Sequence, residues 1–390
     1  MNRKRFKKFR LPTKTPLPNF AWDAPRLQKA EEQFLLRGGM FVGSLRRLDS
    51  TDREQLTIEA ISGEAVTTSE IEGEILDRAS VQSSVRRQLG LEADARRVKP
   101  AERGIAEMMV GLYKSFAEPL SEEMLFAWHR MVAKGRSDLK DVGAYRTGDE
   151  PMQVVSGALH APNVHFEAPP CSALADEMPR FVNWFNSSGP AGDRPIPALT
   201  RAGIAHLYFE SIHPFEDGNG RIGRAISEKA LSQPLGQPTL NALAATILIR
   251  KKAYYAALEA ANKGNEITPW LAWFAGIVIE AQRRTAAHIE FLLDKTRLLD
   301  RLRGQINDRQ EKALLRMLRE GPEGFKGGLS AGKYAAITGA PSATTTRDLA
   351  DLAAKQALAR TGERRHTRYF LAIPLRPVEP VKISERGDLE

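Results

Sequence analysis

The stretch HPFEDGNGRIGR, from His213 to Arg224, carries one histidine, two acids, three glycines and two arginines in twelve residues. Its glycines have the spacing GxGxxG, which is typical of dinucleotide-binding folds when a strand precedes them and an acid follows about 20 residues later. Here the preceding segment, ALTRAGIAHLYFESI, spaces its apolar residues as a helix does. No Asp or Glu lies between Glu228 and Glu259, and the sequence holds no GxxxxGK[ST] motif. The stretch therefore predicts neither a dinucleotide fold nor a P-loop.

The same residues predict an anion site at the start of a helix. The turn Gly218-Asn219-Gly220 brings backbone N–H groups together, and the segment RIGRAISEKAL predicts a helix whose N-terminus attracts negative charge. Arg221 and Arg224 are three residues apart, so their guanidinium groups lie on one helical face and can clamp a di- or triphosphate. Asp217, beside this turn, can bring a Mg²⁺ ion to the phosphate oxygens.

His213 is the candidate general base of this site. Pro214 biases the residue before it toward extended geometry, so we expect the helix to end here and the imidazole to face a loop. An ordinary pKa of about 6.5 leaves a neutral fraction that can accept a proton from an incoming hydroxyl. Each residue type alone has a plainer explanation, since histidines cap helices, arginines are surface charges and glycines form loops. Their coincidence in one short turn favours the catalytic interpretation.

The overall composition sets broad limits. A chain of 390 residues has room for two or three domains. Seven basic residues lie in the first fourteen, MNRKRFKKFRLPTK, so the net charge of +9 is weak grounds for a nucleic-acid partner. No apolar run is long enough to span a bilayer, and none follows the basic start as a signal peptide requires. With Cys171 as its one cysteine, the chain is expected in a reducing cytoplasm.

HPFEDGNGRIGR resembles the signature HxFx[DE]GNGRxxR of Fic-domain proteins and matches every specified position. The resemblance covers about residues 100–280 and includes GAYR at 143–146, the FxxPP pattern at 166–170 and the later segment AYYAALEAANKGNEITPWLAWF. The segment from Asn19 to about Leu91 resembles an N-terminal helical domain attached to some Fic proteins. Members of this family are mostly α-helical and typically transfer AMP from ATP to a Ser, Thr or Tyr hydroxyl of a target protein.

The resemblance implies a role for each matched residue. His213 is the general base, and Asp217 is the Mg²⁺ ligand. The alternating segments QVVSG and NVHFE predict a hairpin, which resembles the family's flap and would hold the target segment in extended form. The implied nucleotide-binding residues, with those of the flap, are Gly218, Asn219, Gly220, Arg221, Arg224, Val155, Ser156, Gly157, Tyr254, Tyr255 and Asn262.

A second motif lies upstream of the signature. TSEIEG, from Thr68 to Gly73, resembles the family's inhibitory [ST]xxxE[GN] motif in its N-terminal, class II arrangement. Gly73 can end a helix there, and Glu72 can reach Arg224, which the γ-phosphate of ATP would otherwise occupy. We therefore expect Glu72 to restrain the enzyme. The plainer alternative is a capping threonine and an ordinary surface glutamate.

The predicted fold class is mostly α. It comprises a Fic-type helical core with a short β-hairpin flap, an N-terminal helical domain and a C-terminal winged helix-turn-helix module. Helical patterns in NDRQEKALLRMLRE, LSAGKYAAITG and PSATTTRDLADLAAKQAL, followed by a strand–turn–strand pattern, indicate that module. The expected divisions are a basic tail at 1–20, the N-terminal helical domain at 21–98, the Fic catalytic domain at 99–280, a linker helix at 281–304, the winged helix-turn-helix at 305–374 and a loose C-terminal tail at 375–390.

Three alternatives to AMP addition stay open, one of which is transfer of a different phosphate-containing group by the same site. The same site could remove AMP from a modified target, with Glu72 positioning water. The chain could also be a nucleotide-sensing DNA-binding regulator, although Asp348 and Asp351 on the candidate recognition helix argue against DNA contact. The expected partners are ATP with Mg²⁺, a target protein along the flap and a second copy for self-modification, with no membrane. The arginines available for DNA are Arg360, Arg364, Arg365 and Arg368.

Overall fold

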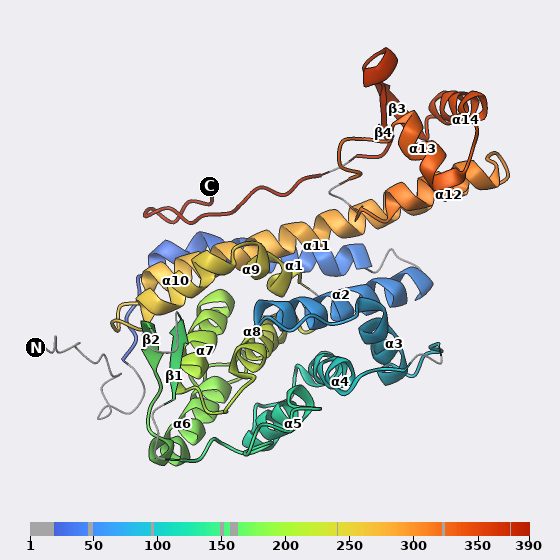
Figure 1. Cartoon of the computed structure of the whole chain (residues 1–390). Coiled ribbons are helices and arrows are strands. Elements are labelled where there is room, and N and C mark those ends of the chain that lie inside the picture. The colour runs from blue at the N-terminus through green and yellow to red at the C-terminus, as the bar shows by residue number, and fades with distance from the viewer. Residues whose placement is uncertain are drawn as a thin grey trace, which may run out of the picture. The chain divides into compact units, whose positions relative to one another are not determined.

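The structure is a computed structural model of the chain, and it describes residues 19–45, 50–94, 97–148, 152–156, 163–239, 241–321, 324–374 and 376–390. The chain forms two compact units (Figure 1). One runs up to Gln282 and includes Pro380–Glu390, and the other is Arg283–Glu379. The described residues are mostly helical, which confirms the predicted fold class.

The N-terminal unit contains most of the helices and one small sheet. The last of its helices, α11 (Thr268–Leu302), continues into the second unit, so the predicted linker helix is the C-terminal part of a longer element. The others are α1 (Ala24–Leu45), α2 (Ser50–Ile71), α3 (Arg78–Gln88), α4 (Pro100–Ser115), α5 (Glu122–Val132), α6 (Leu174–Ser187), α7 (Ala198–Ile212), α8 (Asn219–Leu235), α9 (Leu243–Ile249) and α10 (Lys251–Ala261).

Helices α7 and α8 pack against each other in the core of this unit and carry the signature. α7 is apolar around most of its circumference, which explains why almost every residue in it is buried. Its first turn is capped by Glu31 of α1, whose carboxylate accepts hydrogen bonds from the N–H groups of Leu199 and Thr200 at 2.9 and 2.8 Å. This cap satisfies N–H groups that the helix itself leaves without acceptors.

The predicted hairpin is present as a two-stranded antiparallel sheet. It consists of β1 (Gln153–Ser156) and β2 (Asn163–Glu167), with the pairs Gln153–Glu167 and Ser156–Asn163 at its ends. The register shifts between Val154 and Val155, which marks a bulge. In the described residues no third strand pairs with either edge, so both edges can in principle receive an extended peptide.

The second unit contains α12 (Asp308–Leu318), α13 (Ala331–Thr338) and α14 (Ser342–Ala354), followed by β3 (Leu358–Thr361) and β4 (Arg368–Leu371), which pair antiparallel. This is the element order that the sequence predicts, while the assignment as a winged helix-turn-helix stays a prediction. α12 starts at a capping box formed by Asn307 and Gln310, and α13 ends at Gly339 in left-handed geometry.

The last eleven residues pack onto the N-terminal unit, so the expectation of a loose C-terminal tail was wrong for this segment. Val381 and Ile383 are buried in the main hydrophobic core. Arg26 of α1 donates a hydrogen bond to the carbonyl of Ser384 at 3.0 Å. The segment also closes on itself, because the backbones of Lys382 and Glu390 exchange two hydrogen bonds. Sequence alone missed it because two apolar residues among Pro and charged residues form no recognisable period.

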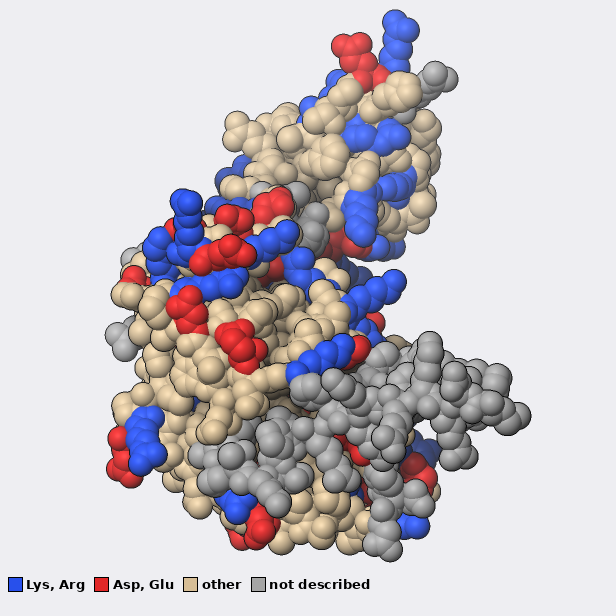
Figure 2. Space-filling view, turned by 90° about the vertical axis from the view of Figure 1, so that its left-hand side faces the viewer, with Lys and Arg blue, Asp and Glu red and all other residues tan. Residues whose placement is uncertain are grey.

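The face of the molecule shown in Figure 2 carries charges of both signs. On the face shown in Figure 2, Lys and Arg side chains are interspersed with Asp and Glu side chains. In the part of the chain that the structure describes, no helix is both long enough and apolar enough to cross a membrane.

Candidate active site

The signature forms the turn between α7 and α8. His213 ends α7 in left-handed geometry, with φ 50° and ψ 59°, and its N–H still donates to the carbonyl of Phe209 at 2.9 Å. The expected extended geometry before Pro214 was therefore wrong, although the helix does end at this residue. The steric bias of proline is outweighed here by the helix-terminating hydrogen bond and by contacts to the His213 carbonyl.

Arg146 is the main contact to that carbonyl. Its Nε donates to the carbonyl of His213 at 2.8 Å, and its backbone N–H donates to that of Pro214 at 2.9 Å. A third bond runs from Nη2 to the carbonyl of Pro169 at 2.6 Å. Arg146 is buried and so fixes the backbone at the candidate base. The sequence offered GAYR and FxxPP only as parts of a resemblance, and the tertiary structure shows why both motifs accompany the histidine.

Asn219 also holds the turn together. Its amide Oδ1 accepts from the N–H of Phe215 at 3.0 Å, and its Nδ2 donates to the carbonyl of the same residue at 2.8 Å. Phe215 itself is buried and stacks on His129, with ring centroids 4.2 Å apart. The Asn219 side chain is therefore hydrogen-bonded within the loop, which leaves its backbone N–H as the group that can donate to an anion.

The imidazole of His213 is largely buried and close to a second buried acid. Its side chain is 15% exposed, and its Nδ1 lies 3.7 Å from Oε2 of Glu210, one turn earlier on α7. Burial lowers the pKa of His213 to about 4, and the charge of Arg146 acts in the same direction. The imidazole is consequently neutral at physiological pH and can accept a proton. Glu210 was not among the predicted site residues.

Asp217 is half-buried beside the turn. It lies between two cations: Arg136 contacts its Oδ2, and Arg221 Nη2 lies 3.3 Å from the same atom. Burial alone would raise the pKa of Asp217, but Arg221 and the N–H of Gly218 lower it, so the carboxylate is ionised. One such carboxylate fits a Mg²⁺ ion that arrives with phosphate oxygens, because that metal is commonly held by one or two carboxylates. Arg136, which the sequence did not single out, is its competitor for Asp217.

Glu72 forms an ion pair with Arg224, the partner that the inhibitory motif predicts for it. Its Oε1 lies 2.7 Å from Nη2 of Arg224, whose side chain is only 4% exposed. Thr68 holds the same guanidinium, since its hydroxyl accepts from Nε at 2.7 Å and its carbonyl accepts from Nη2 at 2.8 Å. α2 ends directly before Glu72, and Gly73 continues the chain with φ 87°, a conformation that favours glycine. The threonine is therefore a buried ligand of the arginine and not a helix cap.

Gly220 explains how Glu72 comes so close to α8. A Cβ atom at this position would overlap Oε1 of Glu72 and would lie 3.2 Å from Nη1 of Arg224. Nη1 of Arg224 and Nε of Arg221 are buried and have no hydrogen-bond partner among the described residues. Buried donors of this kind are expected to be satisfied. They are available for the oxygens of a bound phosphate.

Glu74 adds a contact that the motif does not include. Its Oε2 accepts from Nη1 of Arg221 at 2.7 Å. The three-residue segment Glu72-Gly73-Glu74 thus places one carboxylate on each arginine of the signature. Two acids separated by one glycine are too common a pattern for sequence to reveal this second contact.

The flap lies close to the candidate base through β2. The rings of Phe166 and His213 have centroids 6.3 Å apart. Val155 and Ser156 lie in β1, where their backbone is paired with β2. Gly157, the third residue predicted for the flap, lies outside the described residues.

The three predicted nucleoside contacts fall in α10 or at its end, in different settings. Tyr254 is 2% exposed, and its hydroxyl lies 2.7 Å from Nε2 of His206, so it belongs to the core and lines no open site in this arrangement. Tyr255 is exposed, and its hydroxyl donates to the carbonyl of Ile71, next to Glu72, at 3.4 Å. Asn262 accepts a hydrogen bond from Ser211 at 2.9 Å.

Comparison with known families agrees with this geometry. A family model for Fic/DOC proteins matches residues 119–231, and a domain of unknown function, DUF4172, matches residues 13–91. A probable protein adenylyltransferase of Aquifex aeolicus is 28% identical over 152 residues, which cover 39% of this chain and 40% of that protein. The protein adenylyltransferase Fic of Drosophila virilis is 34% identical over 105 residues, 26% of this chain and 19% of the relative.

A crystal structure of a Fic family protein from Desulfovibrio desulfuricans aligns over 88% of this chain and 95% of its own, with 21% identity and a TM-score of 0.48. This chain matches less than half of the length of the two adenylyltransferases. The matched segment nevertheless contains the whole signature from His213 to Arg224. Residues 119–231 are therefore a domain of the Fic/DOC family, and this chain is a Fic-domain protein.

Proposed function

We propose that this protein transfers AMP from ATP to a hydroxyl side chain of a target protein, and that its N-terminal helices restrain the reaction. The observation that carries the proposal is the pairing of a neutral, loop-held His213 with two buried arginines that Glu72 and Glu74 occupy. The names of the relatives support the class of reaction, because both are called protein adenylyltransferases.

In the proposed reaction, His213 accepts the proton of the target hydroxyl while the hydroxyl oxygen attacks the α-phosphorus of ATP. A new phosphorus–oxygen bond forms, the bond to the bridging oxygen breaks, and pyrophosphate leaves. The N-terminus of α8, with the N–H groups of Gly218, Asn219 and Gly220, would stabilise the charge on the phosphates. Asp217 would hold Mg²⁺, which, when bound, neutralises part of the phosphate charge.

The flap is the proposed binding surface for the target. An extended target segment would pair with a free edge of the β1–β2 sheet, so that backbone hydrogen bonds around Val155, Ser156 and Gly157 set its register. Phe166 would lie beside the modified side chain, because its ring is close to His213. A second copy of this chain is the simplest available test substrate, because its self-modification can be measured directly.

The restraint is proposed to act on the triphosphate and not on entry to the site. Glu72 takes the Nη2 donor of Arg224 that a γ-phosphate needs, and Glu74 takes Nη1 of Arg221. ATP could still bind, but in a pose that leaves the α-phosphorus out of line with the incoming hydroxyl. Charge-assisted bonds of this kind contribute roughly 1.5–3 kcal/mol each when buried.

The test uses ATP labelled in the α-phosphate and the full chain. Glu72→Gly is expected to label itself and proteins of a lysate more strongly than the wild type does, and mass spectrometry should find an added AMP. His213→Ala in the same background is expected to lose labelling while it still binds ATP. Undiminished labelling by the His213→Ala variant would show that another group is the base.

Removal of AMP is the second candidate, since the Glu72 carboxylate lies against Gly220 and next to Arg224, where it could position a water molecule. Incubation of a pre-labelled protein with the wild-type chain separates the two activities. Loss of label with wild type and retention with Glu72→Gly would favour removal over addition.

A further inference from the structure

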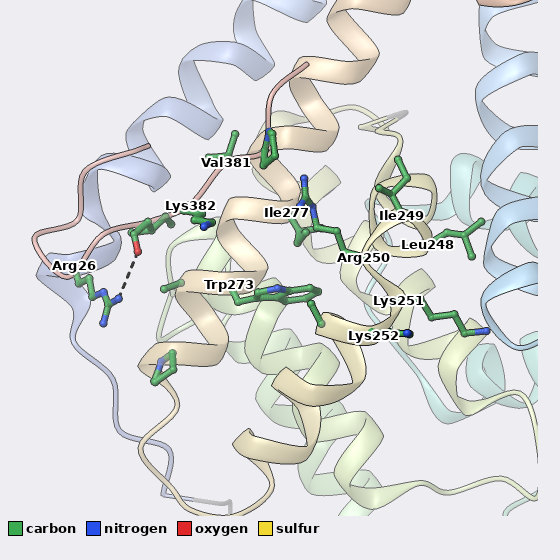
Figure 3. A pocket seen from close by; sticks show the side chains of 15 residues that line it. Arg26, Leu248, Ile249, Arg250, Lys251, Lys252, Trp273, Ile277, Val381 and Lys382 are labelled. Carbon is green, nitrogen blue, oxygen red and sulfur yellow. Dashed lines mark hydrogen bonds between the residues drawn. The ribbon is translucent and has the colours of Figure 1, made fainter. Parts of the chain in front are cut away.

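A second cleft in the N-terminal unit contains none of the residues of the signature or of the inhibitory motif. It lies where α9 meets α10, against the first part of α11 and the C-terminal residues 380–383 (Figure 3). Its volume is about 830 Å³. That falls within the range of cavities that hold small organic ligands.

The charges along this cleft have one sign. Fifteen residues line it; five are Lys or Arg and none is Asp or Glu. Arg26 is engaged with the carbonyl of Ser384, and Arg250 with Glu280. The side chains of Lys252 and Lys382 are exposed and, within the described residues, have no hydrogen-bond or ion-pair partner. These two ammonium groups are therefore free to meet an anion.

The floor of the cleft is aromatic and its rim is apolar. In Figure 3 the indole of Trp273 lies in the middle of the cleft, with Lys382 on one side and Lys252 on the other. Trp273 is only partly buried, although Trp270 stacks near it at a centroid distance of 5.7 Å. Ile249, on the rim, is 61% exposed, which is unusual for so large an apolar side chain. A partly exposed indole between cations suits a flat ring that carries negative charge.

We propose that this Trp273 cleft binds a small organic phosphate whose flat ring packs on the indole while its phosphate meets Lys252 and Lys382. A small molecule fits better than an extended acidic peptide for two reasons. The charges converge on one half-open cleft from α10 and from the C-terminal segment, and the volume matches a single small ligand. The N-terminus of α10, which has no side-chain cap, adds N–H groups on the same side.

The test titrates the full chain with phenyl phosphate and follows the tryptophan indole N–H signals by NMR. The chain has five tryptophans, and loss of one signal in Trp273→Phe identifies the reporter. Phenyl phosphate is expected to shift this signal in the low millimolar range, as a ligand of about eleven non-hydrogen atoms does. Phenol supplies the ring without the phosphate, and inorganic phosphate supplies the charge without the ring. Each is therefore expected to bind at least about tenfold more weakly than phenyl phosphate.

Matched variants separate a built site from adventitious binding. Lys252→Ala with Lys382→Ala is expected to weaken phenyl phosphate binding at least about fivefold. Lys263→Ala, just beyond the C-terminal end of α10 and 62% exposed, is the control and should change nothing. Both sets are surface substitutions, and thermal melting checks that they leave the fold intact.

Three results would overturn the proposal. One is a Trp273 signal that stays still up to about 20 mM phenyl phosphate, well beyond the affinity expected for its size. Another is equal binding by the double lysine variant and the wild type. The third is tighter, lysine-dependent binding of a hexaglutamate peptide, which would make the cleft a docking site for an acidic protein segment.

Discussion

At the scale of single residues, the chemistry of His213 depends on its surroundings. Burial and the nearby Arg146 lower its pKa to about 4, so the neutral imidazole persists well below neutral pH. The group also affects stability. Because its folded pKa lies below its ordinary value, its contribution is present above about pH 6.5 and is lost as the pH falls toward 4.

A pH profile of transfer checks this protonation state. Between pH 8 and pH 6, a histidine with an ordinary pKa would lose about three quarters of its neutral form, a roughly fourfold fall in kcat/KM. With the lowered pKa, kcat/KM of the Glu72→Gly variant should change by less than about 1.5-fold over that range at saturating Mg²⁺. A fourfold fall in kcat/KM would show that the pKa of His213 is not lowered and that its imidazole is in contact with solvent.

Glu210 shows the opposite behaviour one turn away. Burial and repulsion from Glu72 raise the pKa of Glu210 to about 8, and its Oε1 has no hydrogen-bond partner among the described residues. Because the folded pKa is raised, this group destabilises the fold increasingly as the pH rises from about 4.5 to about 8.

Glu210→Gln should remove that penalty. We expect the variant to gain stability over the wild type between pH 5 and pH 8, by on the order of a few kcal/mol at the alkaline end. Urea unfolding at several pH values measures the difference. Glu118→Gln, at an exposed position, serves as the control, and parallel pH curves for Glu210→Gln and wild type would contradict the raised pKa.

At the scale of elements, the end of α2 and the turn after it contact both arginines at the start of α8. Thr68 and Glu72 hold Arg224, while Glu74 holds Arg221, and all three come from one helix end and the turn after it. Gly73 makes the turn that directs both carboxylates to the same helix. The three contacts therefore come from one element, and in the proposed restraint their release would require movement of the end of α2 or competition by phosphate.

Single variants measure the contribution of each carboxylate to the proposed restraint. Glu72→Gly should raise self-labelling roughly tenfold or more, as loss of one charge-assisted bond predicts. Glu74→Gln should raise it less, about threefold, because the Glu74 side chain is about a third exposed and solvent screens the pair. Glu70→Gln, exposed on the same turn of α2, is the matched control. If Glu74→Gln labels itself no more than Glu70→Gln does, the contact between Glu74 and Arg221 does not restrain the reaction.

The candidate recognition helix, α14, is less acidic toward solvent than its sequence indicates. Asp348 is buried and accepts from Arg309 at 3.0 Å and from Tyr334 at 2.9 Å, while Asp351 pairs with Lys355 at 2.5 Å. Of the two acids that argued against DNA contact, Asp348 is thus paired inside the unit, whereas Asp351 is paired with Lys355 at its surface. DNA binding by this unit stays a prediction.

A gel shift with the full chain tests that prediction. If the β3–β4 turn contacts phosphates, replacing Arg360, Arg364 and Arg368 by Ala should weaken duplex binding at low salt and flatten its salt dependence. The same shift for wild type and the triple variant, or no shift at low salt for either, would contradict DNA contact through this turn.

At the scale of the whole molecule, the two ends of the N-terminal unit are tied together. Val381 and Ile383 join the core that contains α1 and α11, and the carbonyl of Ser384 receives Arg26. Deleting residues 380–390 should therefore lower the melting temperature of the N-terminal unit.

Ile383→Ala is the finer version of this test and should destabilise that unit by about 2–4 kcal/mol, as loss of a buried isoleucine does. Calorimetry measures it, and Arg386→Ala, at an exposed position of the same segment, is the control. A deletion variant that melts like the wild type would show that the segment only rests on the surface.

The sequence by itself determined the helical architecture, the place of the turn and which histidine, glycines and arginines form it. It could do so because the signature is local: twelve consecutive residues contain the candidate base, the candidate metal ligand and both arginines. Glu72 could also be predicted as a partner of Arg224, since a short motif marked it.

Only the tertiary structure decided which distant residues complete the site. Arg146, Arg136, Glu74 and Glu210 reach the turn through packing of separate helices and loops, and no spacing rule connects them to it. The same holds for the left-handed backbone at His213 and the buried setting of Tyr254, where contacts across the core outweigh local preference. Local chemistry is encoded by neighbouring residues, whereas burial, and with it the pKa of His213, exists only once the helices have packed.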